Sequence, residues 1–424
     1  QSALSNNSDA RTYHENGDAL EILAQSKDVI EATYKAPFLA HACMEPINCT
    51  ALVKNDSVEI WVPTQSPTLV QMIAARVSDL AKDKVTVHTT YLGGGFGRRI
   101  EMDMVVQVVS IAMQLKGSPI KLVWSREEDM QHDMYRPMAL SHFKVALSDN
   151  GKPDAWFNRN VSQSPSRSVT ERLLPWAAAD MPDNTTSDSV ANIPYEFANQ
   201  LVDHVAMLNP IPVGFWRSVG HSQNAFFSES FIDELAFKAN QDPYQYRRNL
   251  LSDKNKHHRD VLDKVAQLAN WQTPLKQGQY RGIALVESFG SIVAQVAEIT
   301  LKSESTISVD KVYCVVDCGT VINPDTVVAQ IESGIVFGLT AAMFGEINIK
   351  EGRVVESNFP DYQMLTMKDM PTIEVQLAPS GRRIGGIGEV GTPPIAPAIA
   401  NAFFAATKRR IRQLPFAKHK VKLG

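Results

Sequence analysis

The stretch Tyr91–Met104, YLGGGFGRRIEMDM, carries three consecutive glycines, a phenylalanine, a fourth glycine and two arginines between two apolar runs. Backbone N–H groups that no side chain covers can bind an anion, and the positive end of a following helix adds to that attraction. Gly93–Gly97 with Arg98 and Arg99 therefore indicates an anion cradle, and a tight strand-to-helix turn is the structural alternative. The stretch is not a Walker A loop, because no Gly-Lys-Ser/Thr follows. It is not a dinucleotide fingerprint either, because Arg98 stands at the sixth position counted from Gly93.

The sequence on both sides of this loop alternates between strand and helix patterns. Strands are predicted at 56–65, 84–92 and 118–124, and helices at 66–82, 101–115 and from 125 onward. Ser125 and Glu128 have the spacing of a capping box at the start of the last helix. The order β-α-β-α with intervening strands indicates the mixed α+β or α/β class.

The length of 424 residues favours at least two domains, because single cores rarely grow that large. Residues 1–28 are polar and are interpreted as a lead-in segment. A polar stretch with Pro and Gly near 272–282 predicts a boundary, so we expect a first domain at 29–272 and a second at 273–424. The Pro-rich sequence from 150 to 210 predicts long surface loops over a strand or two.

Composition excludes several classes of function. The net charge of −4 offers no whole-protein attraction to nucleic acid, so no nucleic-acid partner is expected. The four cysteines lack the spacing of zinc or iron–sulfur ligands and are expected to be small buried residues, which would place any redox clusters on another chain. No uninterrupted apolar stretch approaches the length of a membrane span. The start has neither an initiator Met nor a signal-peptide pattern and is interpreted as a processed or excised end.

A lone carboxylate, Glu389, lies in a second glycine-rich stretch near the C-terminus, "GGIGEVGTPP". No polar side chain is present on its neighbours Gly388, Val390 and Gly391, so burial could raise the pKa of Glu389 into the range of a general base. On the residue pattern alone, an ordinary loop glutamate is an equally good interpretation.

Five stretches, taken in order, resemble the large subunits of the xanthine oxidase family of molybdenum hydroxylases. They are "VPTQSPTLVQ", "GGGFG", "PVGFWRSVGHSQNAFFSES", "VVDCGTVINPDTVVAQIESGIVFGL" and "GEVGTPPIAPAIANAFFAAT". Nearly the whole chain after residue 30 is similar to the isoquinoline 1-oxidoreductase beta subunit and membrane-associated aldehyde dehydrogenase branch, as its C-terminal portion. The resemblance implies an α+β fold of molybdenum-cofactor-binding domains, with mixed sheets, packed helices and the cofactor between two large domains.

The resemblance implies which residues bind the cofactor. Gln65 matches the glutamine that hydrogen-bonds an oxygen ligand of molybdenum. The loop whose backbone amides lie against the metal centre and its pterin corresponds to Gly94, Gly95, Phe96 and Gly97. Arg98 is expected to help neutralise the pyrophosphate of molybdopterin, which we expect as its cytosine dinucleotide. No metal ligand is expected from the protein, because the pterin dithiolene holds the molybdenum.

Two further residues are implied to be catalytic. Glu389 matches the active-site glutamate that acts as general base, and Arg217 matches the substrate-side arginine. The substrate would be an aldehyde or an N-heterocycle, hydroxylated with oxygen from water. Purines are disfavoured because Ile100 replaces a purine-binding glutamate, and carbon monoxide is disfavoured because Ser218 replaces a copper-binding cysteine.

One family motif, the GQG loop, does not occur in these 424 residues. We therefore expect an N-terminal half or companion chain that bears it. The resemblance further implies a 2Fe-2S subunit, a c-type cytochrome subunit as electron acceptor, and a periplasmic location, with the cytoplasm as the alternative. A non-catalytic scaffold or assembly subunit that kept the fold is the rival interpretation, and the joint presence of Gln65, the glycine loop, Arg217 and Glu389 argues against it.

Overall fold

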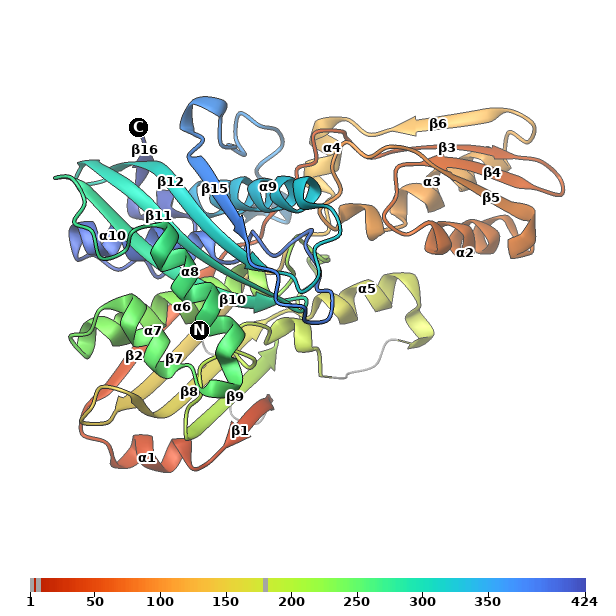
Figure 1. Cartoon of the computed structure of the whole chain (residues 1–424). Coiled ribbons are helices and arrows are strands. Elements are labelled where there is room, and N and C mark those ends of the chain that lie inside the picture. The colour runs from red at the N-terminus through yellow and green to blue at the C-terminus, as the bar shows by residue number, and fades with distance from the viewer. Residues whose placement is uncertain (1–3, 5–8, 178–181) are drawn as a thin grey trace.

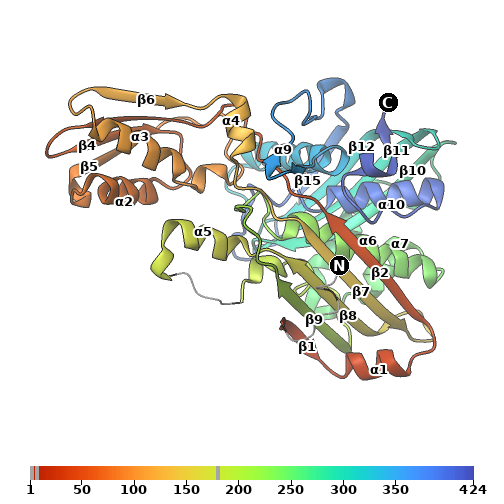
Figure 2. The ribbon, with the colours of Figure 1, turned by 180° about the vertical axis from the view of Figure 1, so that it is seen from behind.

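Three large β-sheets and one two-stranded sheet organise the described part of the chain in the computed structural model, which describes residues 4, 9–177 and 182–424 (Figure 1). The two five-stranded sheets and most helices form a large body, and the four-stranded sheet forms a smaller lobe that extends to one side. Figure 2 shows the same division from behind. The expected α+β class with mixed sheets and packed helices is confirmed.

The lobe is a four-stranded sheet in the order β5-β4-β3-β6 with two helices on one face. Its elements are β3 (Asn48–Val53), β4 (Val58–Val62), α2 (Pro67–Ser78), β5 (Val85–Thr89), α3 (Asp103–Met113) and β6 (Pro119–Val123). Val70 and Ile73 of α2 and Val108 of α3 are fully buried against the sheet. The predicted alternation of strand and helix is therefore confirmed. Helix α4 (Arg126–Gln131) follows, and Ser125 caps it by accepting a hydrogen bond from the Glu128 amide at 3.1 Å.

The first body sheet runs in the order β1-β9-β8-β7-β2. Its strands are β1 (Ala10–Asn16), β2 (Val29–Ala36), β7 (Ala139–Leu147), β8 (Pro153–Ser162) and β9 (Asn199–Ala206), and only β8 and β9 pair in parallel. Strand β1 pairs with β9, and α1 (Ala19–Gln25) packs on the sheet through Ala19 and Leu23. Residues 10–25 of the expected lead-in segment thus form a strand of this sheet and a helix packed on it. The polar sequence of 10–16 does not show a strand pattern, because this strand is defined by its pairing with β9, which lies far along the chain.

The region from 150 to 210 contains more regular structure than its Pro-rich sequence predicts. Strands β8 and β9 account for the expected strand or two, but α5 (Pro165–Leu173) also forms here. Ser164 caps this helix by accepting from the Arg167 amide at 3.0 Å, and its buried Val169 and Leu173 join the core of the lobe. Two buried apolar residues are too few to give a detectable helical periodicity in the sequence, and the helix is recognised only from its packing against the lobe.

The second body sheet runs in the order β10-β11-β12-β15, with β16 paired to β12. Its strands are β10 (Gln279–Ser288), β11 (Ser291–Ser303), β12 (Thr306–Asp317), β15 (Thr372–Leu377) and β16 (Lys422–Leu423), and a small hairpin joins β13 (Ile349–Lys350) to β14 (Arg353–Val354). The helices of the body are α6 (His221–Lys238), α7 (Pro243–Leu250), α8 (Lys256–Leu268), α9 (Pro324–Met343) and α10 (Ile395–Thr407).

One hydrophobic core runs through both body sheets. Phe231 of α6, Phe143 of β7 and Ile283 of β10 all belong to it and are fully buried. The predicted boundary at 272–273 falls between α8 and β10, where one sheet system ends and the next begins. The hydrophobic core includes residues from both sides of this boundary. The division of the chain into two domains at 272–273 therefore stays a prediction from the sequence.

Helix α9 is long and apolar enough to cross a membrane by length and composition, and half of its most apolar window is buried in the fold. Ile331, Ile335 and Leu339 are fully buried in the body core, which accounts for the apolar composition. Gly334 and Gly338 allow close packing, because a Cβ on Gly338 would lie 2.7 Å from both Thr392 O and Ile395 Cγ2.

Candidate functional site

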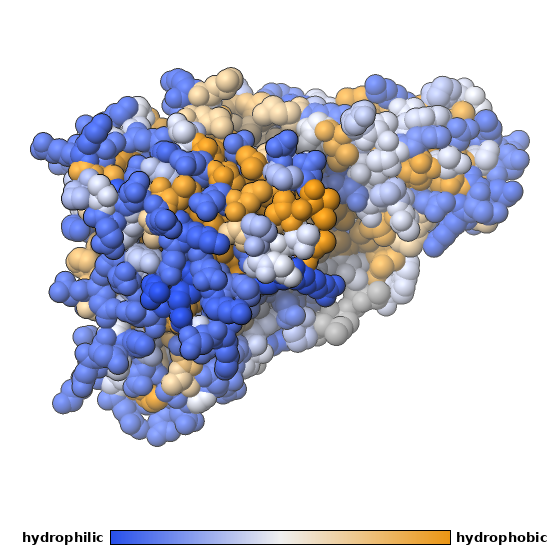
Figure 3. All heavy atoms as spheres, in the orientation of Figure 1, coloured by the Kyte–Doolittle hydropathy of each residue, from blue (hydrophilic) through white to orange (hydrophobic). Residues whose placement is uncertain are grey.

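The glycine loop lies at the junction of lobe and body. It joins β5 to α3 in the lobe, while the residues that meet it come from the 215–218 and 388–389 segments of the body. Figure 3 shows that the surface is hollowed between lobe and body and that apolar side chains gather beside the hollow. The sequence motifs singled out above therefore converge on one place.

Three consecutive backbone amides in this loop are open. Gly93 N–H donates to Glu45 Oε2 at 2.9 Å and Gly97 N–H to Gln65 Oε1 at 3.1 Å. Between them, the amides of Gly94, Gly95 and Phe96 meet no acceptor in the described part of the chain. Phe96 has φ 53° and Gly97 φ 111°, so the backbone turns through the left-handed region. Open amides on such a turn form the kind of concave donor set that binds anions or metal-bound oxygens.

Gln65 is placed by the same loop. Its Oε1 accepts from Gly97, and a Cβ on Gly95 would lie 2.6 Å from that oxygen, so glycine is needed for this approach. The Nε2 group of Gln65 has no partner among the described residues and is the group that can donate to a ligand. Gln65 itself is exposed, beside the three open amides.

Aromatic rings back the loop. Phe96 stacks on Phe337 of α9 with ring centroids 4.4 Å apart, and Phe337 stacks in turn on Trp216 at 4.7 Å. Trp216 is buried and donates from Nε1 to Ala40 O at 3.1 Å, so it packs within the fold. The stack ties the glycine loop of the lobe to α9 of the body through the ring of Phe96.

Arg98 is bound to carboxylates within the protein, so its expected role in neutralising a pyrophosphate stays a prediction that these contacts do not support. Its side chain is 1% exposed, donates to both oxygens of Asp103 at 3.0 and 2.7 Å, and lies 3.1 Å from Asp133 Oδ1. Arg99 also turns inward, donating to Gly94 O at 2.6 Å and to Glu45 Oε2 at 2.7 Å. Both arginines hold the loop from behind because buried guanidinium groups need carboxylates and carbonyls to compensate for lost water. The positive character of the cradle comes from its amides.

Arg217 is also bound within the protein. It donates to Gly388 O from Nε at 2.9 Å and from Nη2 at 2.6 Å, to Ser333 Oγ at 2.9 Å and to Gln330 Oε1 at 3.1 Å. Its guanidinium carbon lies 5.8 Å from the ring centroids of Phe96 and Phe337. Arg217 thus connects the aromatic stack to the glutamate loop, and its role toward substrate stays a prediction.

Glu389 lies half-buried on the body side of the junction. Burial raises the pKa of its carboxyl, and the shift is opposed by the backbone amide of Ser218 and by the charge of Arg217. Its main-chain carbonyl accepts from Ser218 Oγ at 2.6 Å and from the Thr392 amide at 3.1 Å. A carboxyl with a raised pKa on a tightly held backbone is suited to accept a proton at a defined position.

Sequence reasoning missed two residues that shape the site. His41 is buried, and its ring lies within hydrogen-bond distance of Asp133 Oδ1 at 2.8 Å through Nδ1 and of Phe215 O at 2.9 Å through Nε2. Ser218, noted only because it is not a cysteine, has φ 76° and contacts Glu389. Neither residue belongs to a periodic apolar pattern that would single it out in the sequence. The sequence feature that could have pointed to Ser218 is its position next to Arg217.

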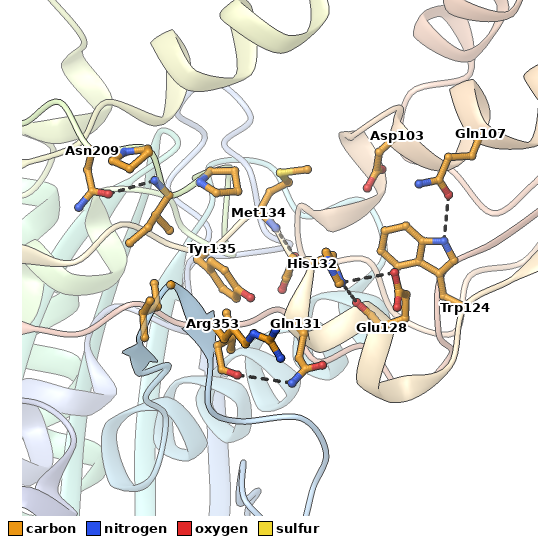
Figure 4. Close-up of a pocket in the computed structure, with 17 residues that line it drawn as sticks. Asp103, Gln107, Trp124, Glu128, Gln131, His132, Met134, Tyr135, Asn209 and Arg353 are labelled. Atoms are coloured by element: carbon orange, nitrogen blue, oxygen red, sulfur yellow. Dashed lines mark hydrogen bonds and ion pairs between the residues drawn. The ribbon is translucent and has the colours of Figure 1, made fainter.

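A separate groove of about 960 Å³ is lined by residues of the lobe and of the body (Figure 4). Tyr135, Met134 and Trp124 line it, and Figure 4 shows His132 beside Glu128 at its rim. It shares Asp103 and Asp133 with the ion pairs of Arg98. None of the predicted site residues lines it, so the groove is not the cradle.

The residues at the junction fit a cofactor that presents oxygen atoms. The described residues contain no group of three or more His, Cys, Asp or Glu side chains able to hold a metal ion directly. The donor set at the junction is instead the three open amides and Gln65 Nε2. A Cβ on Gly97 would lie 1.5 Å from Phe215 O, so the loop can pack against the 215–218 turn this closely only with glycine there.

Comparison with known sequences agrees with this geometry. Residues 4–251 and residues 234–371 each match a molybdopterin cofactor-binding domain. The chain is 33% identical over 397 residues to the beta chain of isoquinoline 1-oxidoreductase from Brevundimonas diminuta, covering 91% of this chain and 49% of that protein. It is 26% identical to the membrane-bound aldehyde dehydrogenase (pyrroloquinoline-quinone) of Gluconacetobacter polyoxogenes, covering 97% of this chain and 56% of that protein. The chain therefore spans about half the length of these relatives.

Solved structures share the fold. Quinoline 2-oxidoreductase from Pseudomonas putida 86 superposes with a TM-score of 0.81 at 15% identity, covering 96% of this chain and 77% of that chain. The aldehyde oxidoreductase from Desulfovibrio desulfuricans superposes with a TM-score of 0.81 at 16% identity, covering 96% and 62% of the two chains. With the two domain matches and the 33% identical relative, these findings show that the chain belongs to the molybdopterin cofactor-binding proteins of the xanthine oxidase family.

Proposed function

We propose that this chain is the molybdopterin-binding catalytic part of an oxidoreductase that hydroxylates an aldehyde or an N-heteroaromatic carbon with oxygen derived from water. One observation carries the proposal: the three open amides of Gly94–Phe96 and Gln65 face the same junction as Glu389, a carboxyl whose pKa burial raises. A donor cradle and a proton acceptor at one place are the parts that such a reaction requires of the protein.

Each residue then has a task that the contacts support. The amides of Gly94, Gly95 and Phe96, with Gln65 Nε2, would hold the molybdenum cofactor by donating hydrogen bonds to it. When bound, the molybdenum cofactor supplies the two-electron redox chemistry. Glu389 accepts the proton of the attacking water at its carboxylate, because its raised pKa makes it a better base than an exposed glutamate. Arg217 holds Gly388 and so keeps Glu389 at the junction.

Substitution of Glu389 tests this assignment. Glu389→Gln keeps the size of the side chain and removes the base, so turnover of aldehydes and N-heterocycles is expected to fall by about 100-fold or more while molybdenum content is unchanged. Glu304→Gln, in an exposed turn of the body, is the matched control and is expected to leave turnover as it is. Unchanged turnover in Glu389→Gln would favour the scaffold alternative.

We also propose the finer composition of the assembly. The cofactor is the cytosine dinucleotide form of molybdopterin, and the partners are a segment or chain bearing the GQG loop, a 2Fe-2S subunit and a c-type cytochrome in the periplasm. Two of the similar proteins, an isoquinoline 1-oxidoreductase and a nicotinate dehydrogenase, are named as single subunits, which supports a multi-subunit complex. Native mass spectrometry with metal and pterin analysis tests this proposal. It should find a companion with a GQG loop and about one molybdenum per assembly; this chain whole, alone and metal-free would contradict it.

A further inference from the structure

The loop that carries Glu389 is held through its carbonyl groups. Ser291 Oγ donates to Gly386 O at 2.6 Å, Arg217 Nε to Gly388 O at 2.9 Å, and Ser218 Oγ to Glu389 O at 2.6 Å. Gln295 Nε2 donates to Gly391 O at 2.9 Å. These four side chains come from the 217–218 turn and from β11, so the loop is fixed from two sides.

Ser218 differs from the other three in donating to the main-chain carbonyl of Glu389 itself. The backbone amide of Ser218 also lowers the pKa of the Glu389 carboxyl, against the larger effect of burial. Ser218 is fully buried, so water does not compete for the hydroxyl contact. Arg217 is the charged group that faces this carboxylate among the described residues.

The backbone of Ser218 is strained in a way that serves these contacts. Ser218 has φ 76° and Val219 has φ 48°, so two consecutive residues other than glycine adopt the left-handed backbone conformation. This conformation is rare for a β-branched residue such as Val219, and such strain persists only where surrounding contacts enforce it. Glycine would satisfy a simple tight turn at lower cost, so the serine is explained by what its hydroxyl binds.

We propose that Ser218 is a positioning residue for Glu389: its buried hydroxyl holds the main-chain carbonyl of the glutamate and so keeps the carboxyl beside the 217–218 turn. The inference rests on the proposed function, in which Glu389 is the base. Loss of the hydroxyl would let the glutamate backbone drift from the Ser218 amide. That amide lowers the pKa of Glu389, so weakening the contact raises the pKa further.

The test compares Ser218→Ala with Ser291→Ala in the intact, molybdenum-loaded assembly. Both substitutions delete a 2.6 Å hydroxyl-to-carbonyl bond from the same loop, but only Ser218 holds Glu389. Ser218→Ala should lower kcat/KM about 10- to 100-fold and move the acid limb of its pH profile to higher pH. Ser291→Ala should do neither. Ser218→Gly tolerates the left-handed backbone and keeps the test valid if the alanine variant folds poorly.

A second measurement does not depend on activity. Infrared titration of the protein follows the Glu389 carboxyl band, identified by its absence in Glu389→Gln, and should show a higher midpoint in both Ser218 variants than in the parent or in Ser291→Ala. Equal effects of Ser218→Ala and Ser291→Ala would overturn the proposal. If Glu389→Gln abolishes turnover while the Ser218 variants leave the titration unchanged, positioning fails and the proposed function stands. If the titration shifts while Glu389→Gln keeps turnover, positioning stands and the catalytic assignment fails.

Discussion

The carbonyl oxygen of Phe215 lies 1.5 Å from the place that a Cβ at Gly97 would occupy. The same oxygen lies 2.9 Å from Nε2 of the buried His41. The glycine loop of the lobe and the 215–218 turn of the body therefore meet at one atom. This contact explains why the last glycine of GGGFG cannot carry a side chain.

Gly97→Ala should disrupt this contact. Its side chain would collide with Phe215 O, and alanine at φ 111° adds backbone strain of about 1–3 kcal/mol. Gly117→Ala is the matched control, because Gly117 also has positive φ (85°) but nothing lies within 4 Å of its Cβ position. Urea unfolding should show a larger loss of stability for Gly97→Ala, together with reduced molybdenum retention. Equal losses in the two variants would contradict a role for the Phe215 contact.

His41 should make stability depend on pH. Burial alone lowers the pKa of His41, but the charge of Asp133 and hydrogen bonds to Asp133 and Phe215 outweigh it, so the pKa is raised above 6.5. Protonated His41 can donate from both ring nitrogens, to Asp133 and to Phe215 O. The folded pKa exceeds the unfolded one, so the stabilisation is complete below about pH 6.5 and is lost as pH rises through the folded pKa. The unfolding free energy of the parent relative to His41→Gln should fall over that range; parallel curves would contradict the assignment.

Arg98→Met should destabilise the fold far more than removal of a surface arginine. It leaves Asp133 without one of its buried cationic partners, which costs about 3–5 kcal/mol when a buried pair is broken. Arg248→Met is the comparison, because Arg248 is 41% exposed and its pair with Asp263 is worth about 0–1 kcal/mol. Denaturant unfolding of both variants measures the difference. A cost for Arg98→Met as small as that of Arg248→Met would show that the buried cluster does not brace the loop.

Gly338→Ala should destabilise the protein although alanine favours helices by about 1 kcal/mol over glycine. The added methyl group would lie 2.7 Å from Thr392 O and Ile395 Cγ2, forcing α9 away from the start of α10. The Thr392 amide also donates to Glu389 O, so the shift reaches the glutamate loop. Thermal unfolding temperature and kcat/KM should both fall. A stabilised variant would mean that propensity outweighs the close packing.

The local elements of the lobe could be predicted because their signals are local. Helices α2 and α3 carry apolar residues at helical spacing, and Ser125 with Glu128 marks a helix start without any tertiary information. Strand β1 and helix α5 could not be found this way, because their burial is supplied by β9 and by the lobe. The spacing of apolar residues predicts the buried face of a helix or strand only where that segment has clearly separate apolar and polar faces.

The sequence by itself determined the order of strands and helices around the glycine loop, the family, and the residues that meet at the junction. The motifs predict these features because binding and catalysis at a site require particular residue types at particular positions. The direction of each side chain was decided only by tertiary structure. Arg98 resembles a phosphate ligand in sequence, yet Asp103 and Asp133 draw it inward, because a buried guanidinium is stable only beside carboxylates. The contacts of His41 with Phe215 and of Ser218 with Glu389 each span more than 170 residues, and such contacts exist only once the chain has folded.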